Sequence, residues 1–235
     1  MKKNPSITLS LYSAILFAIL SGCTDSAKEA DSNIVKDTLN TTQKDKAPNM
    51  PDMSGWAEAS QMVAKQMIEK YGNPNESTDH MLIWYNNGPW KKTIIYSEES
   101  KHIFPVDHVD VMEQVIDYKV SPEKYSDLAA YDGSVTVRRT DGELSAKCDK
   151  EGANFLAINL ANDVATGKKS VADARAFYAM AIKDFALQNK MSPYMESLQF
   201  TIVKGGTVDT DKHGVSEEDN EKITTAMKAM ASKQK

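Results

Sequence analysis

Cys148 carries the most reactive side-chain type among the candidate functional residues of this chain. It lies between Lys147 and Lys150, just before a predicted helix, and cations and amide donors favour the reactive thiolate. However, Leu144, Ala146 and Cys148 alternate along a predicted strand, which directs the sulfur to the apolar face. We therefore predict a buried and inert thiol. The alternative is a thiol-dependent enzyme or hydrolase that pairs Cys148 with a histidine.

A second candidate group consists of histidine and aspartate residues between two predicted strands. His102, His108 and Asp110, with Asp107 between them, offer the nitrogen and oxygen ligands that zinc accepts. Their spacing matches no compact metal-binding motif, and the neighbouring Phe104-Pro105 suggests a loop. We therefore expect solvated loop residues and no metal. A metal site formed by His102, His108 and Asp110 is the alternative.

Aromatic residues surround a predicted turn at Gly88-Pro89. Trp84, Tyr85 and Trp90 could form a platform that binds sugar rings or peptides through large, rigid surfaces. Alternation along a strand sends Trp84 and Tyr85 to opposite faces, so at least one of them is expected in the core. A recognition surface at these residues is therefore one hypothesis beside ordinary packing.

Amide side chains occupy one side of a predicted helix. Asn154, Asn159 and Asn162 lie near Glu151, and buried amides require hydrogen-bond partners. Asn154 and Asn162 are candidate residues of a polar binding pocket. Alternatively, these amides bond to neighbouring backbone or face water.

The predicted helices and strands that carry these residues indicate an α+β fold. We expect a single domain with a mainly antiparallel sheet, built from hairpins and packed with several helices. One helix, Lys150 to Thr166, has apolar residues on two faces and is expected to be covered on both sides. The predicted helices are Ser54 to Tyr71, Pro122 to Ala130, Lys150 to Thr166, Val171 to Gln188 and a weak one from Ser216. The predicted strands are Met81 to Asn86, Lys92 to Ser97, Met112 to Val120, Ser134 to Thr140, Glu143 to Cys148 and Tyr194 to Val203.

The strongest hairpin signal is Asp141-Gly142. Both residue types suit the left-handed backbone of a two-residue turn, and β-rich runs flank them. We therefore predict that this dipeptide joins two neighbouring strands directly.

The overall charge argues against nucleic-acid binding. The chain has 235 residues and a formal net charge of −5, and its basic pairs Arg138-Arg139 and Lys168-Lys169 are isolated. The run Gly167-Lys168-Lys169-Ser170 lacks the earlier glycine and the leading strand of a phosphate-binding loop. We therefore expect no nucleic-acid partner and no cofactor.

The first residues have the pattern of an export signal. A basic start, Met1-Lys2-Lys3, precedes an uncharged apolar run from Ile7 to Leu20, which is shorter than the roughly 20 residues of a membrane-spanning helix. Small residues, Ser21 and Gly22, stand directly before Cys23. Residues 1–23 resemble the signal peptide and lipobox of bacterial lipoproteins.

This resemblance implies a covalent lipid anchor. In such proteins the cysteine, here Cys23, carries diacylglycerol on its sulfur, cleavage exposes its amino group, and that group is commonly acylated. Several acyl chains hold a protein firmly at a membrane. Thr24, in place of an aspartate after the cysteine, implies the periplasmic face of the outer membrane if the cell has two membranes.

The resulting organisation has four parts. Residues 1–22 are a signal peptide, residues 23–53 are the lipidated cysteine and a flexible polar tether, residues 54–204 are the α+β domain, and residues 205–235 are a polar segment with a weak helix. Since no catalytic constellation is evident, we predict a membrane-anchored, non-catalytic binding or envelope-accessory module. Its expected partners are the membrane and either an envelope protein or a small envelope ligand.

Overall fold

The computed structural model of the protein describes residues 50–203 and 211–233. The predicted signal peptide, Cys23 and most of the predicted tether lie outside the described residues. The same holds for residues 204–210 and 234–235. Met50 and Met53 pack against a core cluster, so packing begins a few residues before the predicted domain boundary at Ser54.

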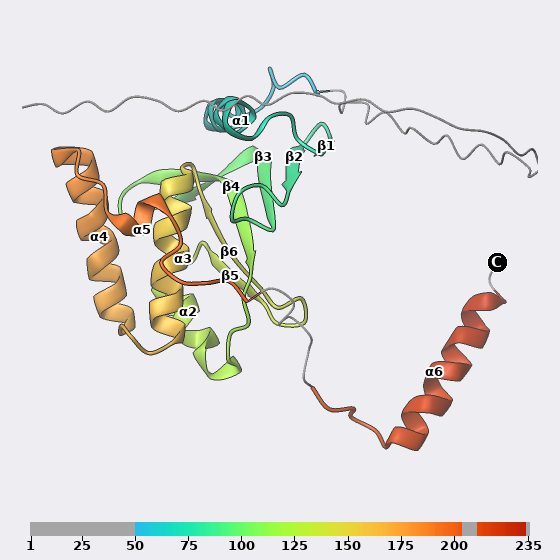
Figure 1. The fold of residues 1–235 in the computed structure, drawn as a ribbon. Helices are drawn as coiled ribbons and strands as arrows, with labels where there is room; N and C mark the ends of the chain where they lie inside the picture. Colours follow the sequence, from blue (N-terminus) through green and yellow to red (C-terminus); the bar gives the residue numbers. More distant parts are fainter. Residues whose placement is uncertain (1–49, 204–210, 234–235) are drawn as a thin grey trace, which may run out of the picture. The chain divides into compact units, whose positions relative to one another are not determined.

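An antiparallel sheet of six strands organises the described domain (Figure 1). Its order is β1-β2-β3-β4-β6-β5, in which neighbouring strands are also close in sequence. The predicted α+β class with a mainly antiparallel sheet is confirmed. The strands are β1 (Glu76–Ser77), β2 (Met81–Tyr85), β3 (Lys92–His102), β4 (His108–Asp117), β5 (Val135–Arg138) and β6 (Glu143–Cys148).

Helices cover both faces of this sheet. Helix α1 packs against β3 and β4 on one face, and α3 packs against β4, β5 and β6 on the other. Helices α4 and α5 contact the outer side of α3, which confirms that this helix is covered on both sides (Figure 1). The helices are α1 (Glu58–Tyr71), the short 3₁₀ helix η1 (Pro122–Lys124), α2 (Tyr125–Tyr131), α3 (Glu151–Ala165), α4 (Val171–Gln188), α5 (Pro193–Glu196) and α6 (Glu217–Ser232).

Two apolar clusters follow from this layering. The smaller one lies between α1 and the sheet and includes Val63, Leu82 and Trp84. The larger one lies between the sheet and helices α2 to α5, with α3 as its centre. The middle of α3 is therefore buried on nearly all sides, as expected for a helix between two layers.

The predicted strand from Tyr194 to Val203 is wrong. This segment begins with the short helix α5, and residues 201–203 have no regular structure. Ser192 caps α5, because its hydroxyl accepts from the backbone N–H of Tyr194. Asn159 on α3 then takes the place of a partner strand: its amide donates to the carbonyls of Tyr194 and Ser197 and accepts from the Gln199 N–H.

The loop that contains Asp141-Gly142 has four residues, whereas a two-residue turn was predicted. Strands β5 and β6 do form a hairpin, but the last pair is Arg138 with Glu143, so residues 139–142 make a four-residue loop. The N–H of Gly142 donates to the Arg139 carbonyl at 3.2 Å, and Gly142 has a φ of 61°. Only the glycine is left-handed, whereas the predicted two-residue turn needs two left-handed residues.

The C-terminal helix begins where the sequence predicts it. The Ser216 hydroxyl accepts from the backbone N–H of Asp219 at the start of α6, and no residue of α6 is buried. Among the described helices, none has both the length and the apolarity to cross a membrane.

Candidate functional site

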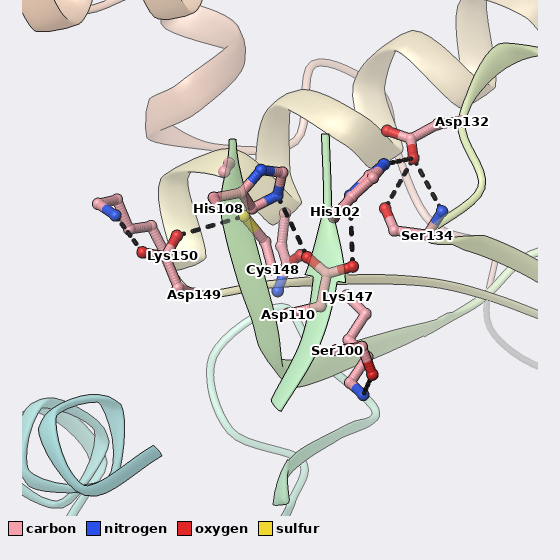
Figure 2. Close-up of polar contacts among 12 residues, drawn as sticks. Ser100, His102, His108, Asp110, Asp132, Ser134, Lys147, Cys148, Asp149 and Lys150 are labelled. Carbon is pink, nitrogen blue, oxygen red and sulfur yellow. Dashed lines mark hydrogen bonds and ion pairs between the residues drawn. The ribbon is translucent and has the colours of Figure 1, made fainter. Parts of the chain in front are cut away.

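Two histidines meet where β3 ends and β4 begins. In the antiparallel register His102 pairs directly with His108, and Ser100 pairs with Asp110. Paired residues project to the same face of a sheet, and so do residues two apart on one strand. His102, His108 and Asp110 therefore converge on one side of the hairpin (Figure 2).

The Asp110 carboxylate lies between the two imidazoles. Its Oδ2 is 3.3 Å from His102 Nδ1, and its Oδ1 is 3.2 Å from His108 Nε2. Asp110 is 6% exposed, and both histidines are largely buried. The expectation of solvated loop residues is therefore wrong, because the two strands extend as far as these histidines. The neighbouring Asp110, followed by Cys148, raises the pKa of His108 to about 11.

A second carboxylate approaches His102 from outside the hairpin. Asp132 follows α2 and is 1% exposed, and its Oδ1 lies 3.6 Å from His102 Nε2. The same oxygen accepts hydrogen bonds from the N–H and the hydroxyl of Ser134, at 2.8 and 2.9 Å. Burial raises the pKa of Asp132 despite these bonds. Two histidines and two buried aspartates thus form one cluster, to which we refer below as the His-Asp cluster.

Cys148 lies beside this cluster at the end of β6. The predicted burial of its thiol is confirmed: Cys148 is 5% exposed, and burial raises its pKa although His108 acts in the opposite direction. Its Sγ lies 3.5 Å from Asp149 Oδ1 (Figure 2). His108 is poorly placed as a general base, because its Nδ1 donates to the Val106 carbonyl at 2.8 Å and its Nε2 faces Asp110.

A cavity of about 440 Å³ opens next to Cys148 and His108. Most of its wall is apolar and comes from α4, the loop before β4 and α5. Polar groups gather at one end, where His108, Asp149 and Lys150 contribute to the lining. The apolar residues of the wall include Val106, Tyr178, Ile182, Phe185 and Met195.

The predicted aromatic platform does not form. Trp84 and Trp90 are buried, and only Tyr85 is exposed. The indole N–H of Trp84 donates to the Gly72 carbonyl, and that of Trp90 donates to Glu151 at 2.7 Å. Both tryptophans are therefore core residues with satisfied polar atoms, because β2 and the following turn are covered by α1 and α3.

The amides that were predicted to line a pocket make hydrogen bonds inside the fold instead. Asn154 is fully buried, and its amide donates to the Met112 carbonyl and to Gln114 Oε1 on β4. Asn162 accepts from the Tyr118 hydroxyl at 2.8 Å. These amides connect α3 to the sheet, so their hydrogen bonds serve packing.

Sequence reasoning missed two parts of this region. Asp132 gave no signal, since it is distant from the hairpin in sequence and the fold alone brings it to His102. Tyr178, Ile182 and Phe185 on α4 recur at helical spacing, a pattern that predicts packing against a core. A stripe that packs fully and one that leaves a cavity have the same helical spacing.

Comparison of the chain with protein-family models, with curated proteins and with solved structures finds no match.

Proposed function

We propose that this protein is a lipid-anchored envelope protein whose domain is a non-catalytic module that binds a small, mostly apolar ligand. The observation that carries the proposal is the cavity beside α4. Its volume, about 440 Å³, is within the range of roughly 300–1,000 Å³ that is typical of small-molecule sites.

The lining of the cavity indicates the chemistry of the ligand. Apolar side chains of α4 and Met195 form the long wall, whereas His108, Lys150 and Asp149, which pairs with Lys150, supply polar groups at one end. A site of this kind favours an amphiphile with an apolar body and one polar end, because burial of the body drives binding and the polar groups orient the end. A protein held at a membrane surface would meet such molecules.

The cavity is tested by filling it. Ala186 lines the cavity at an exposed position of α4, so Ala186→Trp should occupy it without disturbing the core. We expect a dansylated medium-chain fatty acid to bind the wild type saturably and to bind Ala186→Trp at least about tenfold more weakly, a difference of about 1.4 kcal/mol.

The matched control is Ala179→Trp, an exposed position of the same helix that does not line the cavity. It should bind the probe as the wild type does. Failure of the wild type to bind, or equal loss in both variants, would contradict the proposed site.

The membrane anchor is tested separately at Cys23. Replacing Cys23 by Ser should abolish incorporation of labelled fatty acid and release the protein from the membrane fraction. The reason is that acyl chains contribute about 0.8 kcal/mol per buried methylene, and no anchor forms without the sulfur. Continued membrane association of the variant would refute the lipid anchor while leaving the cavity proposal intact.

One observation favours the rival function, a thiol-dependent enzyme or hydrolase: His108 interacts with Cys148. Against it stand the burial of the thiol, its raised pKa and the engaged nitrogens of His108. Iodoacetamide should therefore modify Cys148 much more slowly in the native protein than in urea. Equal rates at neutral pH would support the enzyme instead.

A further inference from the structure

We propose that His102, His108 and Asp110 bind a divalent transition-metal ion of the zinc class. The inference does not depend on the proposed ligand cavity. It rests on the positions of the three ligand groups, on two buried atoms that lack a hydrogen-bond partner and on the groups that orient the two imidazoles.

The distances within the His-Asp cluster are close to those of a metal site. A tetrahedral zinc ion with ligands at about 2.0–2.1 Å holds them about 3.3–3.4 Å apart. Asp110 Oδ2 lies 3.3 Å from His102 Nδ1, and Asp110 Oδ1 lies 3.2 Å from His108 Nε2. With one ligand atom taken from each residue, the three candidate atoms all lie within 4.8 Å of one another, so small side-chain rotations would bring them to the spacing that zinc requires.

Two of these atoms lack a hydrogen-bond partner. His102 Nδ1 and Asp110 Oδ1 are buried, and their short contacts across the cluster do not have hydrogen-bond geometry. Asp110 is more than nine-tenths buried, and leaving a buried carboxylate oxygen unpaired is expensive. A cation bound between the two imidazoles would satisfy both atoms.

The outer nitrogen of each imidazole faces an acceptor. His108 Nδ1 donates to the Val106 carbonyl at 2.8 Å, which leaves Nε2 as the ligand. His102 Nε2 faces Asp132 at 3.6 Å, which leaves Nδ1 (Figure 2). Metal-binding histidines almost always direct the second ring nitrogen to a carboxylate or a carbonyl, because this fixes the tautomer and the ring orientation.

The ligand set selects the class of metal. Two imidazoles and one carboxylate suit zinc and its neighbours, such as cobalt and nickel, whereas magnesium and calcium prefer sites made of oxygen atoms. The thiol of Cys148 lies beside His108, but it is not part of the group of atoms that converge. The geometry therefore predicts a site with two nitrogen ligands, one oxygen ligand and no sulfur ligand.

A second cavity, of about 510 Å³, borders the histidines on the side of the β3–β4 loop. Lys101, Ile103 and Asp107 line it together with His102 and His108. A metal held by three protein ligands keeps a fourth position, and this cavity allows water or a small anion to reach it.

Zinc binding by the tag-free, full-length chain in detergent tests this proposal. Competition with a chromophoric chelator should show one zinc ion per chain. Asp110→Asn and His102→Ala should weaken binding by more than about 100-fold, since the change of an outer partner alone costs roughly 10- to 100-fold. Asp132→Asn changes such an outer partner and should therefore weaken zinc binding by roughly 10- to 100-fold.

The matched control is His80→Ala, which removes an exposed histidine outside the cluster and should leave zinc affinity unchanged. Cobalt bound to the wild type should show the absorption of a four-coordinate ion without a thiolate charge-transfer band. Zinc should raise the melting temperature of the wild type and of His80→Ala, and at the same concentration it should not raise that of Asp110→Asn or His102→Ala, which separates lost binding from lost folding.

Two results would overturn the proposal. One is a wild-type chain that binds no zinc at concentrations up to about 1 mM, an affinity of about −4 kcal/mol or weaker. The other is an equal loss of zinc binding in His80→Ala and Asp110→Asn. A thiolate band with cobalt would refute the ligand set.

Discussion

Glu151 connects three elements of the domain through one carboxylate. It begins α3, and its Oε1 accepts from the Tyr71 hydroxyl at 2.6 Å, the Trp90 indole at 2.7 Å and the Gln114 amide at 3.2 Å. Its Oε2 pairs with Lys70. The carboxylate also lies in the first turn of α3, where the helix dipole favours negative charge.

The expected cost of Glu151→Gln follows from these bonds. The glutamine side chain keeps an oxygen that can accept from the same donors, and it leaves no cavity. However, these hydrogen bonds no longer have a charged acceptor. A hydrogen bond to a charged group contributes about 1.5–3 kcal/mol and a neutral one about 0.5–1.5 kcal/mol. For the bonds from Tyr71 and Trp90 together, the loss is about 2 kcal/mol. Lys70 adds little, because its side chain is 52% exposed.

This cost should depend on pH in a defined direction. Burial acts to raise the pKa of Glu151, but hydrogen bonds from Lys70, Tyr71 and Trp90 outweigh it, and the folded pKa is lowered. A carboxyl with a lowered folded pKa stabilises the fold above its unfolded pKa, and this stabilisation is lost as the pH falls through the folded pKa. The difference between wild type and Glu151→Gln should therefore be full at pH 7 and shrink in acid.

Urea unfolding followed by circular dichroism measures both effects, at pH 7 and at steps into the acid range. The control is Glu69→Gln, an exposed carboxylate on α1, which should change the free energy of unfolding by less than about 0.5 kcal/mol. A Glu151→Gln variant as stable as this control at pH 7, or a difference that does not change with pH, would refute the reasoning.

Three further substitutions test the packing, a turn and a helix cap. Leu156→Ala should destabilise the protein by about 2–5 kcal/mol in urea unfolding, because Leu156 is fully buried in α3, whereas Leu187→Ala on exposed α4 surface should have little effect. Gly142→Ala should cost about 1–2 kcal/mol in thermal unfolding, because the φ of 61° is unfavourable for a residue with a Cβ atom. Ser170→Ala should cost about 1 kcal/mol, since the Ser170 hydroxyl accepts from the Asp173 N–H at the start of α4, and an unchanged urea midpoint would contradict this role.

Local sequence patterns were sufficient for most helices and hairpins. Helices were predicted at the positions of α1, α3 and α4, and the structure confirms all three. Alternation placed Leu144, Ala146 and Cys148 on a buried face, as the structure confirms. These features depend on residues within a few positions of one another, so their physical causes are contained in a short stretch of chain.

The candidate site depends on tertiary structure instead. His102 and His108 were recognised as candidate metal ligands, but their convergence with Asp110 required the register of β3 and β4, and Asp132 reaches His102 only through the placement of α2. The segment after Ser192 shows the same dependence, because Asn159 on α3 supplies the hydrogen bonds that a strand would have taken from a neighbour. Spacing along a chain sets which faces residues occupy, whereas the partners that meet across those faces are set by strand register and by how the layers pack.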